Sequence, residues 1–330
     1  MSLVVDVADY AAHYAIESAP ILGAARHCLI EALACGFESL RDAECAALVG
    51  PLVPGALMPG GARIPGTSLE LDPAQAAFCL SVLLARSPGG GEDWLELPSV
   101  CGAASLAAVL ATADYLARKA TMEGKSPPTV RELLAAAVKA LEIQAVLASA
   151  SGEPRAGTAA LRYARIAATA VAAAQLGGTR GQIVTALGYA ALDGALSVET
   201  EAPCGRARML WASAEAMSRA VRHACQATAA RSFAPATSLE EEAADRIERF
   251  LGASRSRRSQ EFGTELVARL ARRRSPQQSE RLAMRFQSAV EGHFPRRQAE
   301  RIKILFATPE RIDALPVNEL LAALVTNGAR

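Results

Sequence analysis

Long alanine-rich segments, in which apolar residues recur every three or four positions, set the strongest constraint on how this chain can fold. The run APILGAARHCLIEALACGFESL at residues 19–40 has this spacing, which is typical of an amphipathic helix. Of the 330 residues, 51% are hydrophobic but only 5% are aromatic. Alanine supplies much of this apolar content and favours close-packed helices over β-sandwiches. We therefore predict an all-α protein without long β-type alternation.

Capping residues predict where several of these helices begin and end. Asp72 is an expected N-cap for a helix that starts at Pro73. Thr129 is followed three residues later by Glu132, which is the spacing of a capping box. A further helix is expected to end at Gly177, because glycine accepts the left-handed conformation that closes many helices.

Two segments interrupt the helical pattern. Residues 49–73 hold four prolines before the final Asp-Pro and predict an extended loop over the surface. The stretch GGGEDWLELPSVCG at residues 89–102 precedes a clear helical segment over 104–120. Its glycines and acids indicate either a functional loop or one that has lost its function, since glycine tolerates a chain that needs no fixed geometry.

Charge and cysteine usage exclude several classes of protein. The net charge of +1 points to neither nucleic acid nor a membrane. The seven cysteines are scattered and never form a C-x-x-C pair, so we expect no disulfide framework, no zinc site and a reducing compartment. The N-terminus shows no secretory signal, and charged residues or glycines break the apolar segments before membrane-spanning length. A cytoplasmic protein without metal, cofactor or membrane partner is predicted.

The composition becomes charged and polar after Phe233. Arginines cluster between Arg255 and Arg258 and again between Arg272 and Arg274. Such clusters could contact phosphates or an acidic partner, but acids are interspersed and aromatic stacking residues are absent. We favour solvated helix ends and a linker, with no nucleic acid bound. Residues 295–325 predict two short closing helices.

Several stretches carry a specific resemblance to a known family. They lie at residues 40–78, 106–120, 139–144, 179–194, 211–222, 294–302 and 315–321. Their sequences resemble the MmgE/PrpD family, and within it the 2-methylcitrate dehydratases. The resemblance extends over about 9–233 and again over about 262–324.

The resemblance implies a fold and a domain division. Family members have a large helical domain and a smaller α/β domain inserted late in the chain, after which the last helices return to the helical domain. The segment between Pro235 and Phe262 is too short for that insertion. We therefore expect a helical domain over 1–235, a charged linker over 236–261 in place of the α/β domain, and returning helices over 262–330.

The same resemblance implies a chemistry that this chain lacks the residues to perform. The family's dehydratases remove water from a small tricarboxylate, which requires a base, an acid and cations that hold carboxylates. Leu141 and Ala160 stand where the family has histidines, and Met209 replaces its lysine. Cys101 occupies another histidine position. None of the chain's own four histidines falls on a catalytic position, and each is expected on a helix surface or in the core (His13, His27, His223 and His293).

Four residues remain as candidates for a vestigial site. Glu92 takes the place of one of the family's loop acids, with Asp93 beside it. Cys101 could act as an acid or nucleophile only with a lowered pKa, and no neighbouring histidine in sequence offers that. Arg208 lies beside the lost lysine position and could bind an anion, although a structural salt bridge is the interpretation that we favour.

Two hypotheses follow. In the first, the chain is a non-catalytic member of the family, linked to propionate breakdown through methylcitrate, and acts as a homodimer or as a heteromer with a full-length member. In the second, it is an active lyase, dehydratase or isomerase on a small carboxylate with a rearranged site. Because a fold does not establish an activity, the resemblance supports a pathway and not a reaction.

Overall fold

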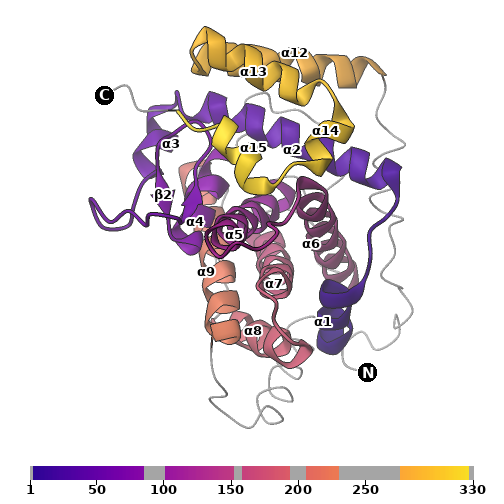
Figure 1. The fold of residues 1–330 in the computed structure, drawn as a ribbon. Helices are drawn as coiled ribbons and strands as arrows, with labels where there is room; N and C mark the ends of the chain where they lie inside the picture. Colours follow the sequence, from indigo (N-terminus) through magenta and orange to yellow (C-terminus); the bar gives the residue numbers. More distant parts are fainter. Residues whose placement is uncertain (1–2, 85–100, 152–157, 194–205, 230–275, 327–330) are drawn as a thin grey trace.

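The protein is an assembly of α-helices, in agreement with the predicted fold class (Figure 1). This computed structural model describes residues 3–84, 101–151, 158–193, 206–229 and 276–326. The elements are α1 (Leu3–His13), α2 (Ala19–Ser39), α3 (Ala43–Leu48), β1 (Ala62–Arg63), β2 (Glu70–Leu71), α4 (Pro73–Leu84), α5 (Cys101–Met122), α6 (Val130–Ser151), α7 (Thr158–Gln175), α8 (Arg180–Leu192), α9 (Arg206–Ala229), α12 (Pro276–His293), α13 (Arg296–Phe306), α14 (Pro309–Ala314) and α15 (Val317–Ala323).

The predicted capping residues begin their helices. The carboxylate of Asp72 accepts hydrogen bonds from the backbone N–H groups of Ala74 and Gln75, both at 3.0 Å. The Glu132 carboxylate accepts from the N–H of Thr129, whose hydroxyl accepts from the N–H of Glu132 at 3.3 Å, which closes a capping box. The local sequence therefore accounts for these helix starts without tertiary contacts.

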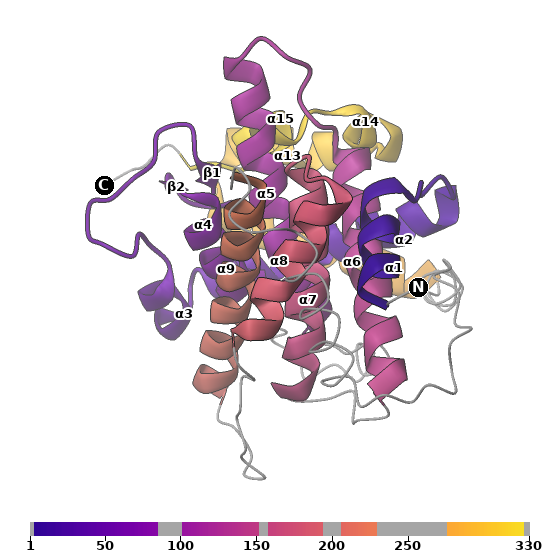
Figure 2. The ribbon, with the colours of Figure 1, turned by 90° about the horizontal axis from the view of Figure 1, so that it is seen from below.

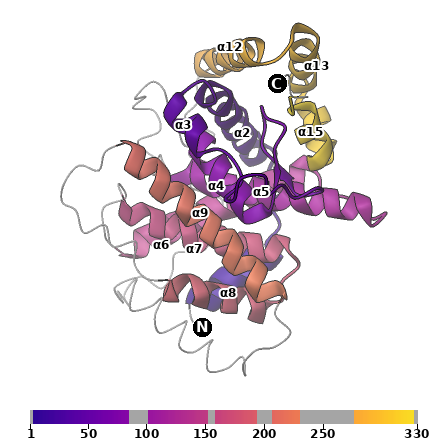
Figure 3. The same cartoon turned by 90° about the vertical axis from the view of Figure 1, so that its left-hand side faces the viewer.

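Alanine allows the central helices to approach closely. Helix α9 packs on α4, α5 and α7, helix α5 also packs on α4 and α7, and α6 packs on α5 and α7 (Figures 2 and 3). Alanines recur every fourth residue on the buried faces of α7 and α9, at Ala164, Ala168, Ala172, Ala216, Ala220 and Ala224. Because the distance between helix axes depends on the side chains at the contact, these small residues let two whole faces meet.

The proline-rich segment differs from the predicted surface loop. It contains a short antiparallel hairpin in which Ala62 pairs with Leu71 and Arg63 with Glu70. Leu71 is buried, and so is Ile64, which follows β1. A Cβ on Gly61 would lie 2.2 Å from the carbonyl oxygen of Leu71, so the close approach of the two strands requires glycine there. Proline spacing alone could not reveal that the base of this loop enters the core.

The C-terminal helices lie against the N-terminal half of the chain. Helix α12 packs on α2, α14 on α6 and α15 on α5. In Figure 1 the orange α12 lies alongside the violet α2. The Arg26 guanidinium of α2 donates two hydrogen bonds to the Asp313 carboxylate of α14, at 2.8 and 2.5 Å. The chain closes with three short helices instead of the predicted two, because α14 begins at Pro309 and Pro316 precedes α15. The predicted linker over 236–261 lies outside the described residues, and the domain boundaries stay a prediction.

By length and composition, one described helix, α2, could cross a membrane. The sequence analysis had expected no segment of membrane-spanning length. The most apolar window of α2 is 61% buried inside the structure. The core helix of a soluble protein meets the same criteria, and here the buried face of α2 packs against α12, α6 and α4.

Candidate functional site

The four predicted site residues are not brought together within the described part of the chain. Glu92 and Asp93 lie outside it. Cys101 is the first residue of α5, and its side chain is not among those described. Arg208 is exposed near the start of α9. The proposed vestigial site therefore stays a prediction.

Two buried polar contacts join the end of α4 to α9 and the start of α5 to α6. The Ser81 hydroxyl, near the end of α4, lies 3.0 Å from the Ser213 hydroxyl, near the start of α9. Ser105, near the start of α5, donates a hydrogen bond to the side-chain oxygen of Gln144 in the second half of α6 at 3.2 Å. All four side chains are buried and neutral. They can orient a polar group, but these contacts supply neither a general base nor a cation.

Of the three replaced positions, Met209 is the one whose surroundings the structure shows to be apolar. Met209 is partly buried and packs against the main hydrophobic core. Leu141 is half-buried on α6, and Ala160 lies in the first turn of α7. A lysine at the position of Met209 would place an ammonium group against apolar side chains, where an unpaired charge is costly.

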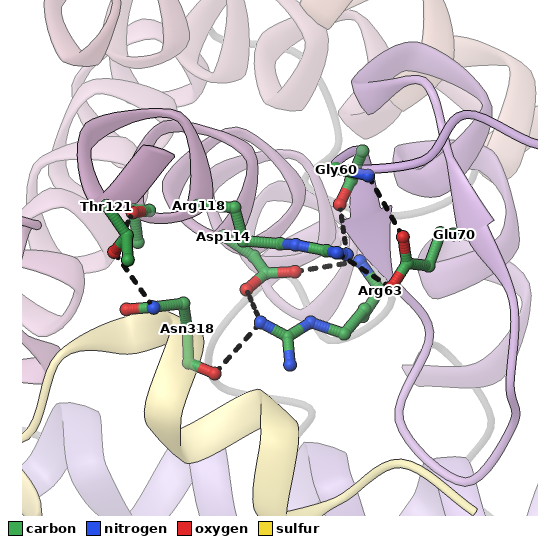
Figure 4. Close-up of polar contacts among 9 residues, drawn as sticks. Gly60, Arg63, Glu70, Asp114, Arg118, Thr121 and Asn318 are labelled. Atoms are coloured by element: carbon green, nitrogen blue, oxygen red, sulfur yellow. Dashed lines mark hydrogen bonds and ion pairs between the residues drawn. The ribbon is translucent and has the colours of Figure 1, made fainter. Parts of the chain in front are cut away.

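A second polar cluster fastens the hairpin to the bundle. The buried Asp114 carboxylate of α5 accepts from the N–H of Arg63 at 2.8 Å and lies 3.5 Å from its guanidinium, which also donates to the Asn318 carbonyl of α15 at 3.0 Å (Figure 4). Arg118 donates to Glu70 of β2 at 2.7 Å and to the carbonyl of Gly61. We call these four charged residues, Arg63, Glu70, Asp114 and Arg118, the hairpin clasp.

Burial dominates the electrostatics of the hairpin clasp. Removal of Asp114 from water raises its pKa to about 6, although Arg63 and Arg118 oppose this shift. Burial also acts to raise the pKa of Glu70, but its hydrogen bonds from Arg118 and Gly60 outweigh that effect and the pKa is lowered. Arg63 pairs with Asp114 and Arg118 with Glu70, so the hairpin clasp joins the two strands to α5.

A third polar cluster joins α7, α8 and α9. Nε2 of His223 lies 3.1 Å from the carboxylate of Asp193, which also accepts from Arg219 at 2.8 Å. Arg165, buried in α7, donates to the Ala190 carbonyl at 3.1 Å. Burial lowers the pKa of His223 despite its contact with Asp193, so the imidazole is neutral at pH 7. His223 thus has a carboxylate partner that its sequence neighbours do not reveal.

Two further histidines contact backbone carbonyls. Nδ1 of His27 lies 2.8 Å from the Gly23 oxygen, one turn earlier in α2. Nε2 of His293 lies 2.7 Å from the Gly66 oxygen, and its ring stacks on Phe37. The His27 ring thus contacts its own helix, whereas the His293 ring joins α12 to α2 and to the segment after β1.

Comparison with known proteins identifies the family. Residues 5–243 match the model of the MmgE/PrpD N-terminal domain. The chain belongs to the MmgE/PrpD family. It is 40% identical over 225 residues to the 2-methylcitrate dehydratase of Escherichia coli K12, covering 68% of this chain and 46% of that enzyme.

More distant relatives repeat this pattern of similarity. The 2-methylcitrate dehydratase of Cupriavidus necator is 39% identical over 221 residues, covering 67% of this chain and 46% of that enzyme. The mitochondrial 2-methylcitrate dehydratase of Yarrowia lipolytica is 37% identical over 222 residues, covering 66% and 42%. The chain thus spans less than half the length of the curated relatives that it matches.

Within this MmgE/PrpD chain, Glu142 is a titrating group that the sequence analysis did not single out. Glu142, in the KALEIQ motif, is buried and accepts a hydrogen bond from the Tyr10 hydroxyl of α1. Burial raises its pKa to about 7. An acid within an apolar helical stretch is the sequence signal that could have identified Glu142.

Among the described side chains, no group of three or more His, Cys, Asp or Glu residues could hold a metal ion.

Proposed function

We propose that this chain is a non-catalytic, 2-methylcitrate dehydratase-like member of the MmgE/PrpD family that acts in the cytoplasm as a partner in a homo- or heteromeric assembly. Its place would be propionate breakdown through methylcitrate. One observation carries the proposal: Met209 packs against the hydrophobic core at the position where the resemblance expects a lysine. A helical domain that keeps its packing but lacks these proton-transfer residues fits a role in binding better than one in proton transfer.

The rest of the domain supports the same conclusion. Leu141 and Ala160 cannot transfer protons, and the buried hydroxyls of α4, α5 and α9 supply no substitute. The buried acids Asp114 and Glu142 titrate near neutral pH, but each is bonded to a structural partner from another element, Arg63 and Tyr10 respectively. Both oxygens of Asp114 face Arg63, so that carboxylate is not available to a carbon acid, whereas Oε1 of Glu142 is buried without a hydrogen-bond partner among the described residues.

An alternative function rests on a different observation. Arg208 is exposed near the start of α9, where a cation could hold a small carboxylate. An active lyase or isomerase would combine it with Glu92, Asp93 and Cys101. A site open to water weakens electrostatic catalysis, which favours the non-catalytic proposal.

An assay of catalytic turnover distinguishes the non-catalytic proposal from an active lyase or isomerase. The purified chain, its Glu92→Ala variant and the Escherichia coli relative are assayed side by side on 2-methylcitrate, citrate and cis-aconitate. We expect turnover from the relative alone. Turnover by the chain that falls in the variant would refute the non-catalytic proposal. Co-purification with a full-length family member would support the heteromeric form.

A further inference from the structure

Helix α1 is joined to the bundle by a buried contact between two polar side chains. It packs on α6, α7 and α8, and in Figures 1 and 2 it lies beside α6. The Tyr10 hydroxyl of α1 donates a hydrogen bond to Oε2 of Glu142 on α6, which lies 132 positions further along the chain. Both residues are buried. The other buried side chains of α1 are small: Val4, Val7, Ala8 and Ala11.

The Glu142 carboxyl has fewer hydrogen bonds than an ionised group needs. Its Oε1 atom is buried without a partner among the described residues. A carboxylate can accept about four hydrogen bonds, so burying the charge with a single one from Tyr10 is costly, whereas a neutral carboxyl is penalised far less. Burial accordingly raises the pKa of Glu142 to about 7. Ionisation therefore favours any movement that exposes this carboxylate to water.

The charged groups around α6 do not relieve this cost. Burial is the cause of the raised pKa of Glu142, and no charge on the described residues contributes to it. Lys139, one turn earlier on α6, donates instead to the Ala11 carbonyl of α1 at 2.8 Å. Charged groups on the helices that pack against α6 pair with other residues: Arg26 of α2 with Asp313 of α14, Asp114 of α5 with Arg63, and Arg165 of α7 with Asp193.

Movement of α1 is the simplest way to expose Glu142, because Tyr10 lies against the carboxyl. Residues 14–18 join α1 to α2 without helical structure, so α1 can move while α2 keeps its own contacts. A further polar attachment of α1 is the Asp9 carboxylate, 3.6 Å from the largely exposed Arg180 guanidinium of α8. Ion pairs of this kind contribute little. A helix with small buried side chains and few polar attachments is the type of element that opens locally.

We propose that the contact between Tyr10 and Glu142 is a pH-sensitive latch: it docks α1 on the bundle while the Glu142 carboxyl is protonated, and α1 opens when the carboxyl ionises. Because docking raises the pKa from 4.5 to about 7, docking is strongest below about pH 4.5, weakens as the pH rises to about 7 and then stays level. Opening uncovers the faces of α6, α7 and α8 on which α1 packs. The latch does not depend on the proposed function.

Hydrogen exchange followed by mass spectrometry tests the latch, with α1 and α5 read from separate peptides and the rates corrected for the intrinsic effect of pH. In the wild type, α1 should be less protected than α5, and its opening constant should rise at least about tenfold from pH 5 to pH 8. The side chain in Glu142→Gln cannot ionise but can still accept from Tyr10, so its α1 should open equally at both pH values. His13, exposed at the end of α1, is present in both proteins, so the difference belongs to Glu142.

Asp9→Asn is the matched control. It weakens the attachment of α1 to α8 but keeps Glu142, so α1 should open more at each pH with the pH dependence of the wild type.

Two results would overturn the inference. Protection of α1 equal to that of α5 at pH 8 in the wild type would mean that α1 opens only when the whole fold does. The same pH dependence of α1 in the wild type and Glu142→Gln would assign the effect to another group. Protection of α5 in the variant shows whether it is folded, and the wild-type measurement tests the latch without it. Neither result bears on the proposed function, which the turnover assay tests separately.

Discussion

Substitution of Asp114 by asparagine tests whether burial or ion pairing controls the hairpin clasp. The asparagine side-chain oxygen can accept the hydrogen bond that the carboxylate now accepts from the N–H of Arg63 at 2.8 Å. The variant therefore keeps the contact between the hairpin and α5 but loses the titrating group. Any pH dependence that differs between the two proteins then belongs to Asp114.

The direction and size of the effect follow from the pKa. Burial raises the pKa of Asp114 from 3.8 to about 6, so the folded protein holds this proton more tightly than the unfolded chain. The free energy of unfolding must then fall as pH rises from about 4 to about 6, and stay level above that range. A shift of about two units is worth about 3 kcal/mol. At pH 7 the ionised carboxylate costs the fold this amount relative to pH 4.

Urea unfolding measured at a series of pH values checks this expectation. The wild type should lose about 3 kcal/mol more than Asp114→Asn between pH 4 and pH 7. Asp114→Ala is the control: its profile should run parallel to that of the asparagine variant but lie lower, since it lacks the acceptor for Arg63. Parallel profiles for the wild type and Asp114→Asn would refute the reasoning, because they would mean that Arg63 and Arg118 fully offset the burial of the carboxylate.

Two further predictions concern other buried contacts. Burial raises the pKa of Glu142 to about 7. The variant Glu142→Gln should therefore increase the free energy of unfolding by about 1–3 kcal/mol at pH 8, and this gain should vanish at pH 4. An equal gain at both pH values would contradict the prediction. Arg285 of α12 donates to both oxygens of the Glu38 carboxylate of α2, at 3.0 and 2.7 Å. Arg285→Ala should lower stability by about 1–2 kcal/mol and speed hydrogen exchange in α12, and unchanged exchange there would show that apolar contacts alone hold the helix.

Local features of the sequence predicted most of the helical fold. The three-and-four spacing indicated α2, and Asp72 and Thr129 marked the starts of α4 and α6. These predictions succeed because capping and helical periodicity involve residues within one or two turns of each other. The family assignment is also confirmed. It could be made from the sequence because the motifs that carry it are continuous stretches of chain.

The pairings between distant residues were decided by the tertiary structure. Arg63 meets Asp114 across 51 positions, and His223 meets Asp193 across 30. Periodicity shows which face of a helix is buried, but it does not say which element packs there. The sequence analysis also missed the hairpin inside the proline-rich segment. The burial of its strands depends on α4 and α5, against which they lie, and these contacts cannot be read from the local sequence.

At the candidate site, too, the sequence predicted some features and the tertiary structure decided others. The resemblance indicated Leu141, Ala160 and Met209 as positions where the family has histidines or a lysine, and these replacements stay a prediction. Only the packed structure decided that Met209 contacts the hydrophobic core and that Arg208, one residue away, is exposed. Neighbours on a helix point about 100° apart, so one turn can hold both a core residue and a surface cation, and the packing of α9 determines which is which.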